Sequence, residues 1–309
     1  MLITGSAILT LGTTANTGSA GNIWYNTTTN QLNYAYQSPP AWSAGGALIT
    51  GREGLGGAGT QNATLAFGGS SGGVVACTEA YDGTSWTAGG IMNCGRAQLV
   101  GAGTQNAALA AGGFISSATT CTEEYDGTTW TAGGALSTAR YYLGGTGLQN
   151  AAIVFGGYDN FGYTCTEEYD GTSWTTGGAL NQNNNMPASA GTQNAALAIG
   201  GTYVQDCTQE YDGSTWTSGG NLITGRYALA GAGTQTAATV FGGYSAGYKT
   251  CTETYNGTSW TAGGALGTAR CKLAGAGSQV SALAIGGYQN ASISCTEEYN
   301  EGSICIGCV

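Results

Sequence analysis

The stretch Ala-Ala-Ile-Val-Phe-Gly-Gly at residues 151–157, followed by Cys-Thr-Glu-Glu-Tyr-Asp-Gly-Thr-Ser-Trp at residues 165–174, decides the fold of this 309-residue chain. An apolar run ends in two glycines, and a second run ends in an Asp-Gly turn and a tryptophan. Short segments of this kind, broken by Gly, Asn and Asp-Gly, are typical of antiparallel strands joined by tight turns. We find no stretch with helical periodicity and helix caps, so we expect essentially no helix.

The same pattern recurs along the chain at a nearly constant spacing. Six tryptophans follow at intervals of 44, 44, 44, 42 and 44 residues: Trp42, Trp86, Trp130, Trp174, Trp216 and Trp260. The glycine pairs show the same intervals and begin at Gly68, Gly112, Gly156, Gly200, Gly242 and Gly286. A fixed period of roughly 20 to 50 residues marks solenoids and propellers. In the third unit we expect the first strand at residues 139–143, then a Gly-rich turn, and the second strand at residues 151–155. Four strands per unit predict an all-β, six-bladed propeller with antiparallel blades.

The unit also resembles the kelch repeat. That family combines a double glycine, a Tyr-Asp turn, a following tryptophan and an arginine, found here as Gly156-Gly157, Tyr169-Asp170, Trp174 and Arg140. The resemblance covers roughly residues 42–300. It implies a binding platform, although a few kelch propellers carry enzymatic sites. The Gly/Thr/Ala-rich array and residues 21–29 are further similar to tail-fibre and other structural proteins of bacteriophages, including cyanophages.

Composition excludes several function classes. The net charge is −10 and the seven basic residues form no run, so we expect no nucleic-acid partner. No apolar stretch approaches the roughly 20 residues that span a bilayer, so we expect no membrane insertion. The chain has no histidine, which removes the commonest general base and most zinc and copper sites. We expect no catalytic residue, no cofactor and no metal.

The six copies differ mainly in two loops. The turn between the first two strands and the Tyr-Asp-Gly turn are nearly constant, whereas the loop between the second and third strands and the loop entering the next unit vary. In an up-and-down blade both variable loops lie on one face, where binding residues concentrate. We predict that this face binds the ligand through Phe114, Tyr158, Phe161, Tyr163, Tyr203, Tyr244, Tyr248 and Tyr288. The alternative is that these surface loops have simply drifted.

Five arginines each precede a glutamate by 27 residues. The combinations are Arg52 with Glu79, Arg96 with Glu123, Arg140 with Glu167, Arg226 with Glu253 and Arg270 with Glu297. The fourth unit has Asn184 and Gln209 instead and so loses both charges together. Because a buried arginine without its carboxylate is costly, joint loss is what buried ion pairs predict.

The ten cysteines fall into two groups. Six occupy one position of the repeat and are expected to be small buried apolar residues, too far apart between blades for disulfides: Cys77, Cys121, Cys165, Cys207, Cys251 and Cys295. The others are Cys94, Cys271, Cys305 and Cys308, whose redox state the sequence leaves open; the last two suit a terminal staple or, with weaker support, a metal. Free thiols indicate assembly in a reducing cytoplasm.

The ring must be closed by one end of the chain. We expect the Trp42 strand to complete the blade that begins near Arg270, with residues 302–309 as the competing candidate. We therefore predict an N-terminal extension at residues 1–36, a propeller at 37–301 and a Cys-containing tail at 302–309. The extension, read as an attachment segment rather than a signal peptide, should contain a hairpin from Ile23 to Tyr36.

Three functions follow in order of preference. The first is a virion surface or tail-fibre protein, assembled in the host cytoplasm, that binds a host-surface glycan or a neighbouring virion protein and contacts other virion proteins through its N-terminal segment. The second is a secreted or cellular kelch-type binding module. The third is a carbohydrate-active enzyme, which a deep acidic pocket on the ring axis would favour. The sequence does not decide the ligand or whether the chain forms a homo-oligomer.

Overall fold

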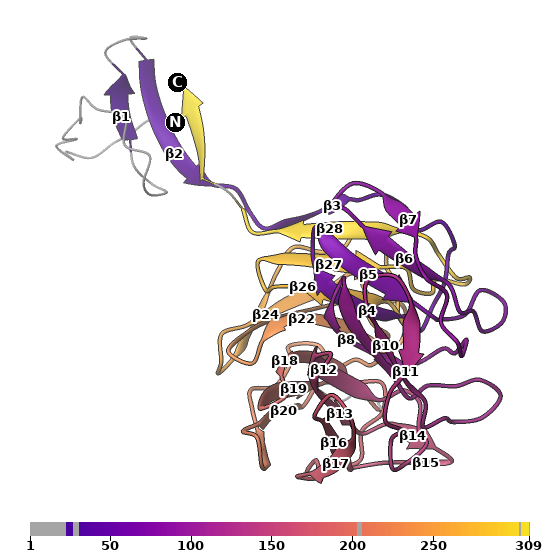
Figure 1. Ribbon diagram of the computed structural model, residues 1–309. Coiled ribbons are helices and arrows are strands. Elements are labelled where there is room, and N and C mark those ends of the chain that lie inside the picture. Colours follow the sequence, from indigo (N-terminus) through magenta and orange to yellow (C-terminus); the bar gives the residue numbers. More distant parts are fainter. Residues whose placement is uncertain (1–22, 27–30, 203–205, 303, 309) are drawn as a thin grey trace. The chain divides into compact units, whose positions relative to one another are not determined.

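The structure is a computed structural model that describes residues 23–26, 31–202, 206–302 and 304–308 (Figure 1). It contains only strands, turns and loops in these ranges. The chain divides into two compact units, of which one is formed by Ala41–Asn300 and the other by Met1–Pro40 with Glu301–Val309. The larger unit is the propeller.

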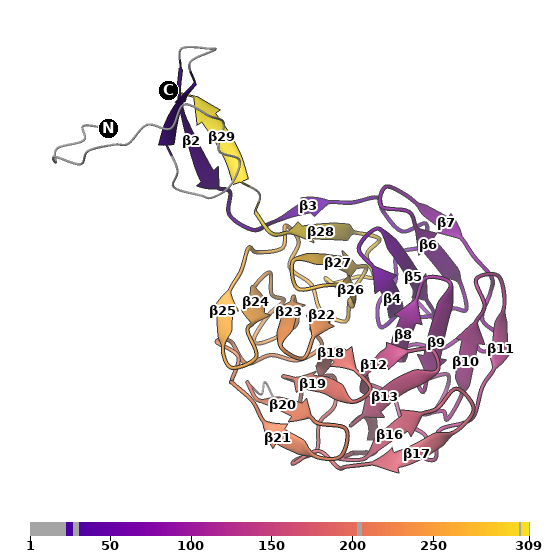
Figure 2. The same cartoon turned by 60° about the vertical axis from the view of Figure 1, so that its left-hand side comes forward.

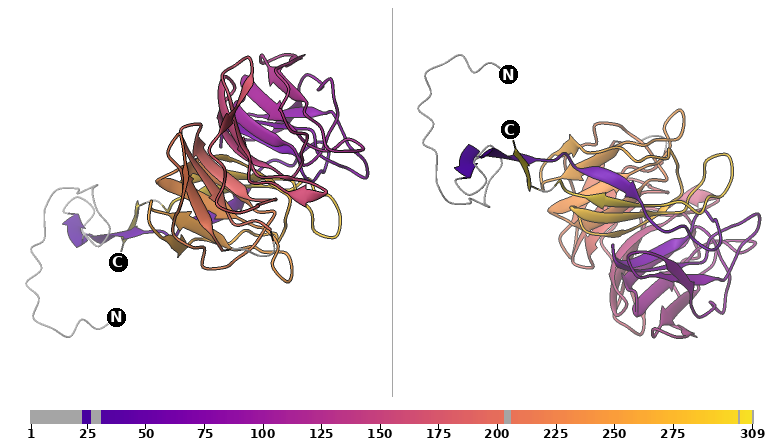
Figure 3. Two further views of the ribbon diagram at one scale, coloured as in Figure 1. Left: turned by 90° about the horizontal axis from the view of Figure 1, so that it is seen from below. Right: turned by 90° about the horizontal axis from the view of Figure 1, so that it is seen from above.

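The propeller consists of six blades arranged round an axis (Figures 2 and 3). Each blade is a four-stranded antiparallel sheet in which the first strand is innermost. Blade 1 contains β4 (Gly56–Thr60), β5 (Ala63–Phe67), β6 (Thr78–Tyr81) and β7 (Trp86–Ala88). Blade 2 contains β8 (Val100–Thr104), β9 (Ala107–Ala111), β10 (Thr122–Tyr125) and β11 (Trp130–Ala132). Blade 3 contains β12 (Gly144–Leu148), β13 (Ala151–Phe155), β16 (Thr166–Tyr169) and β17 (Trp174–Gly177), with a small hairpin, β14 (Tyr158–Asp159) and β15 (Phe161–Gly162), in its loop.

The remaining blades repeat this arrangement. Blade 4 contains β18 (Ala188–Thr192), β19 (Ala195–Ile199), β20 (Thr208–Tyr211) and β21 (Trp216–Ser218). Blade 5 contains β22 (Ala230–Thr234), β23 (Ala237–Phe241), β24 (Thr252–Tyr255) and β25 (Trp260–Ala262). Blade 6 contains β26 (Ala274–Gly277), β27 (Ser281–Ile285), β28 (Thr296–Asn300) and β3 (Ala41–Ala44). The predicted six-bladed, four-stranded architecture is therefore confirmed.

The strand that contains Trp42 closes the ring. In blade 6, β3 pairs with β28, and Trp42 lies opposite Tyr299. The competing candidate, β29 (Ile304–Cys308), instead pairs with β2 (Gln31–Gln37), which also pairs with β1 (Ile23–Asn26). The tail is thus a strand of the smaller unit, together with the expected hairpin.

One strand prediction is wrong. The innermost strand of blade 3 is not 139–143 but the Gly-rich segment 144–148 that we expected to be a turn, and the turn itself is reduced to Gln149 and Asn150. Glycine is needed in these strands because the six innermost strands crowd round the axis. A Cβ on Gly101 would lie 2.5 Å from the Gly57 carbonyl oxygen, and one on Gly275 would lie 2.5 Å from that of Gly231.

Three contacts join each blade to its neighbour. The indole Nε1 of each repeat tryptophan donates to a threonine hydroxyl of the preceding blade, for example from Trp130 to Thr78 at 2.9 Å. The side-chain amide of the turn glutamine donates to two backbone carbonyls of the neighbouring blade, as Gln149 does to Ala108 at 3.1 Å and Tyr125 at 2.7 Å. Apolar side chains of the second strands, such as Leu65 and Phe67, pack between the sheets. The constant residues of the repeat are therefore scaffold residues.

Candidate recognition surface

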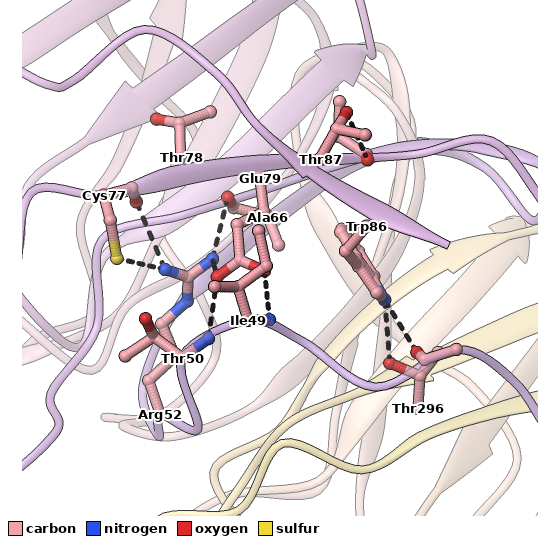
Figure 4. Close-up of polar contacts among 12 residues, drawn as sticks. Ile49, Thr50, Arg52, Ala66, Cys77, Thr78, Glu79, Trp86, Thr87 and Thr296 are labelled. Atoms are coloured by element: carbon pink, nitrogen blue, oxygen red, sulfur yellow. Dashed lines mark hydrogen bonds and ion pairs between the residues drawn. The ribbon is translucent and has the colours of Figure 1, made fainter. Parts of the chain in front are cut away.

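Each of the five arginines forms an ion pair with the predicted glutamate inside its own blade. The guanidinium groups are fully buried, and Arg52, Arg140 and Arg270 lie 3.1, 2.8 and 2.7 Å from their carboxylates. The other two pairs are Arg96 with Glu123 and Arg226 with Glu253. Figure 4 shows that Glu79 also accepts the backbone N–H of Ile49, at 2.6 Å, so the carboxylate fixes the loop that enters the blade.

Blade 4 replaces this ion pair with two neutral amides. Asn184 donates to the Gly200 carbonyl at 2.8 Å, and Gln209 accepts the backbone N–H of Asn181 at 2.8 Å. Both side chains are buried. The amides make the same kinds of contact as the arginine and glutamate elsewhere, which explains why both charges can be lost together.

The cysteines of the repeat differ from the expectation of simple apolar filling. They are half-buried, and in blade 3 the Arg140 Nη1 lies 2.7 Å from the Cys165 sulfur. Similar arginine contacts occur at Cys77 and Cys295. The sulfur atoms therefore act as weak acceptors for the buried guanidinium groups rather than only filling space. No disulfide joins the cysteines whose side chains the structure describes.

Both variable loops lie at one end of the blades, which we call the variable face. In five blades the segment before the innermost strand bridges to the segment after the second strand, as Tyr141 does to Tyr158 and Tyr227 does to Tyr244. In blade 4 the Asn185 N–H donates to the Thr202 hydroxyl instead. The loop of one blade also contacts the segment entering the next, since the Gly157 N–H donates to the Asn184 carbonyl at 2.8 Å. The nearly constant Gln-Asn turns lie at the opposite end of the innermost strands.

A ring of six backbone hydrogen bonds surrounds the axis on the variable face. Each member donates its N–H to the carbonyl of the equivalent residue in the preceding blade, at 2.6 to 3.0 Å, until the ring closes on itself. We call these residues the mouth ring: Gly54, Gln98, Tyr142, Met186, Ala228 and Lys272. They surround a shallow cavity of about 80 Å³, whose lining also includes Leu143, Pro187, Leu229 and Leu273.

The mouth ring is the most variable position of the repeat, and our sequence analysis missed it. All six members have left-handed backbone, with φ between 52° and 59°, yet only blade 1 has glycine there. A non-glycine residue in this conformation costs roughly 1–2 kcal/mol. The signal in the sequence was available, because six different residue types stand two positions after the arginine or its Asn184 equivalent in otherwise similar units. Strained and varied side chains at a shared opening indicate a functional site.

The predicted aromatic residues gather in two groups on the variable face, separated by blades 1 and 4. The blade 2–3 cluster joins Phe114, Tyr141, Tyr142 and Tyr158, with ring centroids 5.0 to 5.6 Å apart. Phe161 and Tyr163 form a separate pair at 4.9 Å. Of these residues, Tyr141 and Tyr142 were missed, because the sequence analysis assigned residues 139–143 to the first strand rather than to the loop that enters the blade.

The blade 5–6 cluster forms a continuous row of tyrosines. Tyr227, Tyr244, Tyr248 and Tyr288 follow one another with ring centroids 5.6, 5.5 and 6.0 Å apart. Tyr227 was missed for the same reason as Tyr141. The remaining predicted member of the aromatic set, Tyr203, lies outside the described residues.

Charged groups adjoin the blade 5–6 cluster. The Lys272 ammonium lies 5.5 Å from the centre of the Tyr288 ring and 3.2 Å from the Glu53 carboxylate. Burial alone would lower the pKa of Lys272, but Tyr142 and Glu53 together raise it above its ordinary value, so the ammonium is charged at neutral pH. Burial raises the pKa of Tyr142, and the charge of Lys272 partly opposes this rise. Tyr142 and Lys272 both line the cavity of the mouth ring.

The channel beyond the mouth is lined mainly by the backbone of the innermost strands. Its far end is a cavity of about 180 Å³, whose only side-chain hydroxyls among the described lining residues belong to Thr146 and Ser189. Both donate to backbone carbonyls of neighbouring blades. The part of the axis that the structure describes is lined by neither Asp nor Glu.

No group of three or more His, Cys, Asp or Glu side chains among the described residues is placed to hold a metal ion. Within the same ranges, no helix is long and apolar enough to cross a membrane.

The fold and this surface define a six-bladed β-propeller with a constant scaffold and one variable, tyrosine-rich face. A comparison of the chain with protein-family models and with curated proteins finds no match. The propeller architecture is compatible with a binding or structural module.

Proposed function

We propose that this chain is a non-enzymatic recognition propeller of a phage virion, in a tail fibre or another surface protein, and that its variable face binds a host-surface glycan. The observation that carries the proposal is the confinement of variation to one end of a nearly constant scaffold. Tyrosines supply large, rigid contact area with a polar tip, which suits the mixed apolar and hydroxylated surface of a sugar.

A binding role is supported over catalysis by the chemistry of the axis. Propeller enzymes need a group that transfers protons or activates a nucleophile, and beyond the mouth the described lining of the channel offers only backbone groups and two engaged hydroxyls. The glutamates of the repeat are committed to the scaffold, since one pairs with arginine and the next accepts from a tyrosine of the neighbouring blade, as Glu124 does from Tyr169.

The virion setting is supported by the resemblance of the repeat and of residues 21–29 to phage structural proteins. The smaller unit supplies a means of attachment to other virion proteins. Within its described strands β2 is central, and β1 and β29 each keep one edge without a partner strand. Open edges pair readily with strands of another chain. Localisation in the virion and contact through this unit are parts of the same proposal.

A glycan array tests the proposal. We expect the wild-type protein to bind a defined set of glycans, and a variant with Tyr244, Tyr248 and Tyr288 changed to alanine to lose them. The matched control changes Asn62, Asn106 and Asn150 to alanine in the exposed turns at the opposite end. Absence of any bound glycan, together with a protein partner seated on the variable face, would replace glycan binding by assembly with a neighbouring virion protein.

A further inference from the structure

The positive charge of this protein is distributed very unevenly. All five arginines are buried in ion pairs with glutamates, so the two lysines are the only cationic side chains in the chain that solvent can reach. Both lie on the variable face: Lys249 directly follows Tyr248 in the sequence, and the Lys272 ammonium lies 5.5 Å from the centre of the Tyr288 ring. In a chain of net charge −10, this concentration marks one place where an anion is favoured.

The two sides of the mouth differ in charge as well as in sequence. The loop of blade 3 carries Asp159 beside Tyr158. Blades 2 and 3 contain no lysine, and their arginines are buried. The loops of blades 5 and 6 carry both lysines and no Asp or Glu between Tyr244 and Lys249 or between Tyr288 and Ser292. The aromatic groups are therefore not equivalent, and the cationic one suits a negatively charged ligand.

The backbone of this region is fixed, so its side chains are presented on a rigid support. The Lys249 N–H donates to the Gly243 carbonyl at 2.9 Å, and its own carbonyl accepts the Arg270 N–H at 3.2 Å. The Asn290 N–H donates to the Tyr248 hydroxyl at 3.4 Å, which links the loops of blades 5 and 6. Lys272 belongs to the hydrogen-bonded mouth ring. A preorganised surface of this kind loses little entropy when a ligand binds.

We propose that the blade 5–6 cluster, with Lys249 and Lys272, binds an anionic saccharide, with a sugar ring against Tyr244, Tyr248 and Tyr288 and its acid group at the lysines. The proposal rests on the glycan-binding function above and adds the class of sugar. Tyrosine rings offer apolar faces for the C–H groups of a pyranose, and the two ammonium groups supply charge-assisted hydrogen bonds. Glu53 pairs with Lys272 and would compete with the acid group of the ligand for it.

The test uses two ligands that share the same sugar chain and differ in whether their carboxyl groups are charged or methyl-esterified. Trigalacturonate and its fully methyl-esterified form are titrated into the full-length protein by calorimetry, with a sulfated trisaccharide to distinguish a carboxylate from another acid group. We expect trigalacturonate to bind at least about tenfold more tightly than the ester, because charge-assisted bonds are lost in the ester. The preference should shrink as salt is raised, because salt screens exposed charges.

Variants then assign the effect to residues. The double variant Lys249→Gln/Lys272→Gln should abolish the preference for the acid, so that trigalacturonate and its ester bind this variant with the same affinity. Glu53→Gln frees Lys272 and should tighten binding of trigalacturonate several-fold, whereas an unchanged or weaker affinity would overturn the role given to Lys272. Asp159→Asn, on the other side of the mouth, is the matched control and should change neither affinity.

The outcomes separate the two proposals. If neutral glycans bind as tightly as acidic ones and the lysine variants do not change either affinity, the proposal of an anionic saccharide is wrong and the proposal of glycan recognition stands. If neither the array nor the calorimetry detects any glycan, the proposed function itself is wrong.

Discussion

The buried pair of Arg140 and Glu167 gives a quantitative test of the scaffold. Their side chains are 0% and 3% exposed, and the atoms Nη2 and Oε1 lie 2.8 Å apart. Changing Glu167 alone to glutamine leaves a buried guanidinium without its counter-charge, which costs about 3–5 kcal/mol of unfolding free energy. Changing Arg140 alone to asparagine leaves the buried carboxylate and should cost a similar amount.

The double variant Arg140→Asn/Glu167→Gln should cost much less than the two single changes together. Blade 4 already contains this amide pair, and Asn184 keeps the contact to the Gly200 carbonyl that Arg140 makes to Gly156. We expect a coupling energy of about 2–3 kcal/mol in a double-mutant cycle.

Urea denaturation is the suitable assay, because guanidinium salt would itself screen the charges. The partly exposed pair of Glu53 and Lys272 is the control, and neutralising it should change the unfolding free energy by less than either single change at the buried pair. If the cost of the double variant equals the sum of the two single costs within about 0.5 kcal/mol, the two buried charges do not depend on each other and the expected coupling is wrong.

Three further predictions concern single elements of the repeat. The turn aspartates Asp82, Asp126, Asp170 and Asp212 accept backbone N–H groups that lower their pKa. Their contribution to stability is therefore present above pH about 4 and is lost as the pH falls through the lower folded pKa. In a variant with all four changed to asparagine, the residue that blade 5 has as Asn256, the urea midpoint should fall less in acid than in the wild type. Burial and a hydrogen bond to a glutamate raise the pKa of Tyr81, Tyr169 and Tyr211 to about 12. Phenolate absorbance should therefore appear at a higher pH in the folded protein than in urea, and the stability that these tyrosines contribute should be full below pH about 10 and fall as the pH rises towards 12. Ala228→Gly should leave the unfolding free energy unchanged or raise it by up to about 1 kcal/mol, because relief of the left-handed backbone offsets the entropy that glycine adds to the unfolded chain. Ala196→Gly in β19 should lower the unfolding free energy, and urea denaturation measures both changes.

The architecture could be predicted from the sequence because it depends on spacing. Six evenly spaced tryptophans and glycine pairs require a repeat, and each of these residues has the same contact in every blade. The Arg–Glu pairs were equally accessible, since Asn184 and Gln209 change together. The innermost strands could not be recognised, because glycine ordinarily disfavours a strand, and its value here comes from the approach of a neighbouring strand such as that of Gly57 to Gly101.

The candidate site was predicted only in its outer part. Aromatic residues in loops of variable length stand out in the sequence, which is why Tyr158 and Tyr244 were found. The mouth ring shares no residue type, so its only signal in the sequence is that Gly54, Met186, Lys272 and their equivalents differ at one fixed place in the repeat. What they have in common is a closed ring of hydrogen bonds between blades, and only the folded chain brings those six positions together.

The claim that the variable face is the recognition surface can be tested by calorimetry. The affinity for a bound glycan is measured on variants of the two ends of the ring. One set changes Gln98, Tyr142 or Lys272 to glycine, the residue that blade 1 has at this position; the other changes Asn62, Asn106 or Asn150 to alanine. We expect the mouth-ring variants to lose about tenfold or more in affinity, and the turn variants to bind as the wild type does. Unchanged affinity in every mouth-ring variant, with losses confined to the turn variants, would contradict the claim that the variable face is the recognition surface.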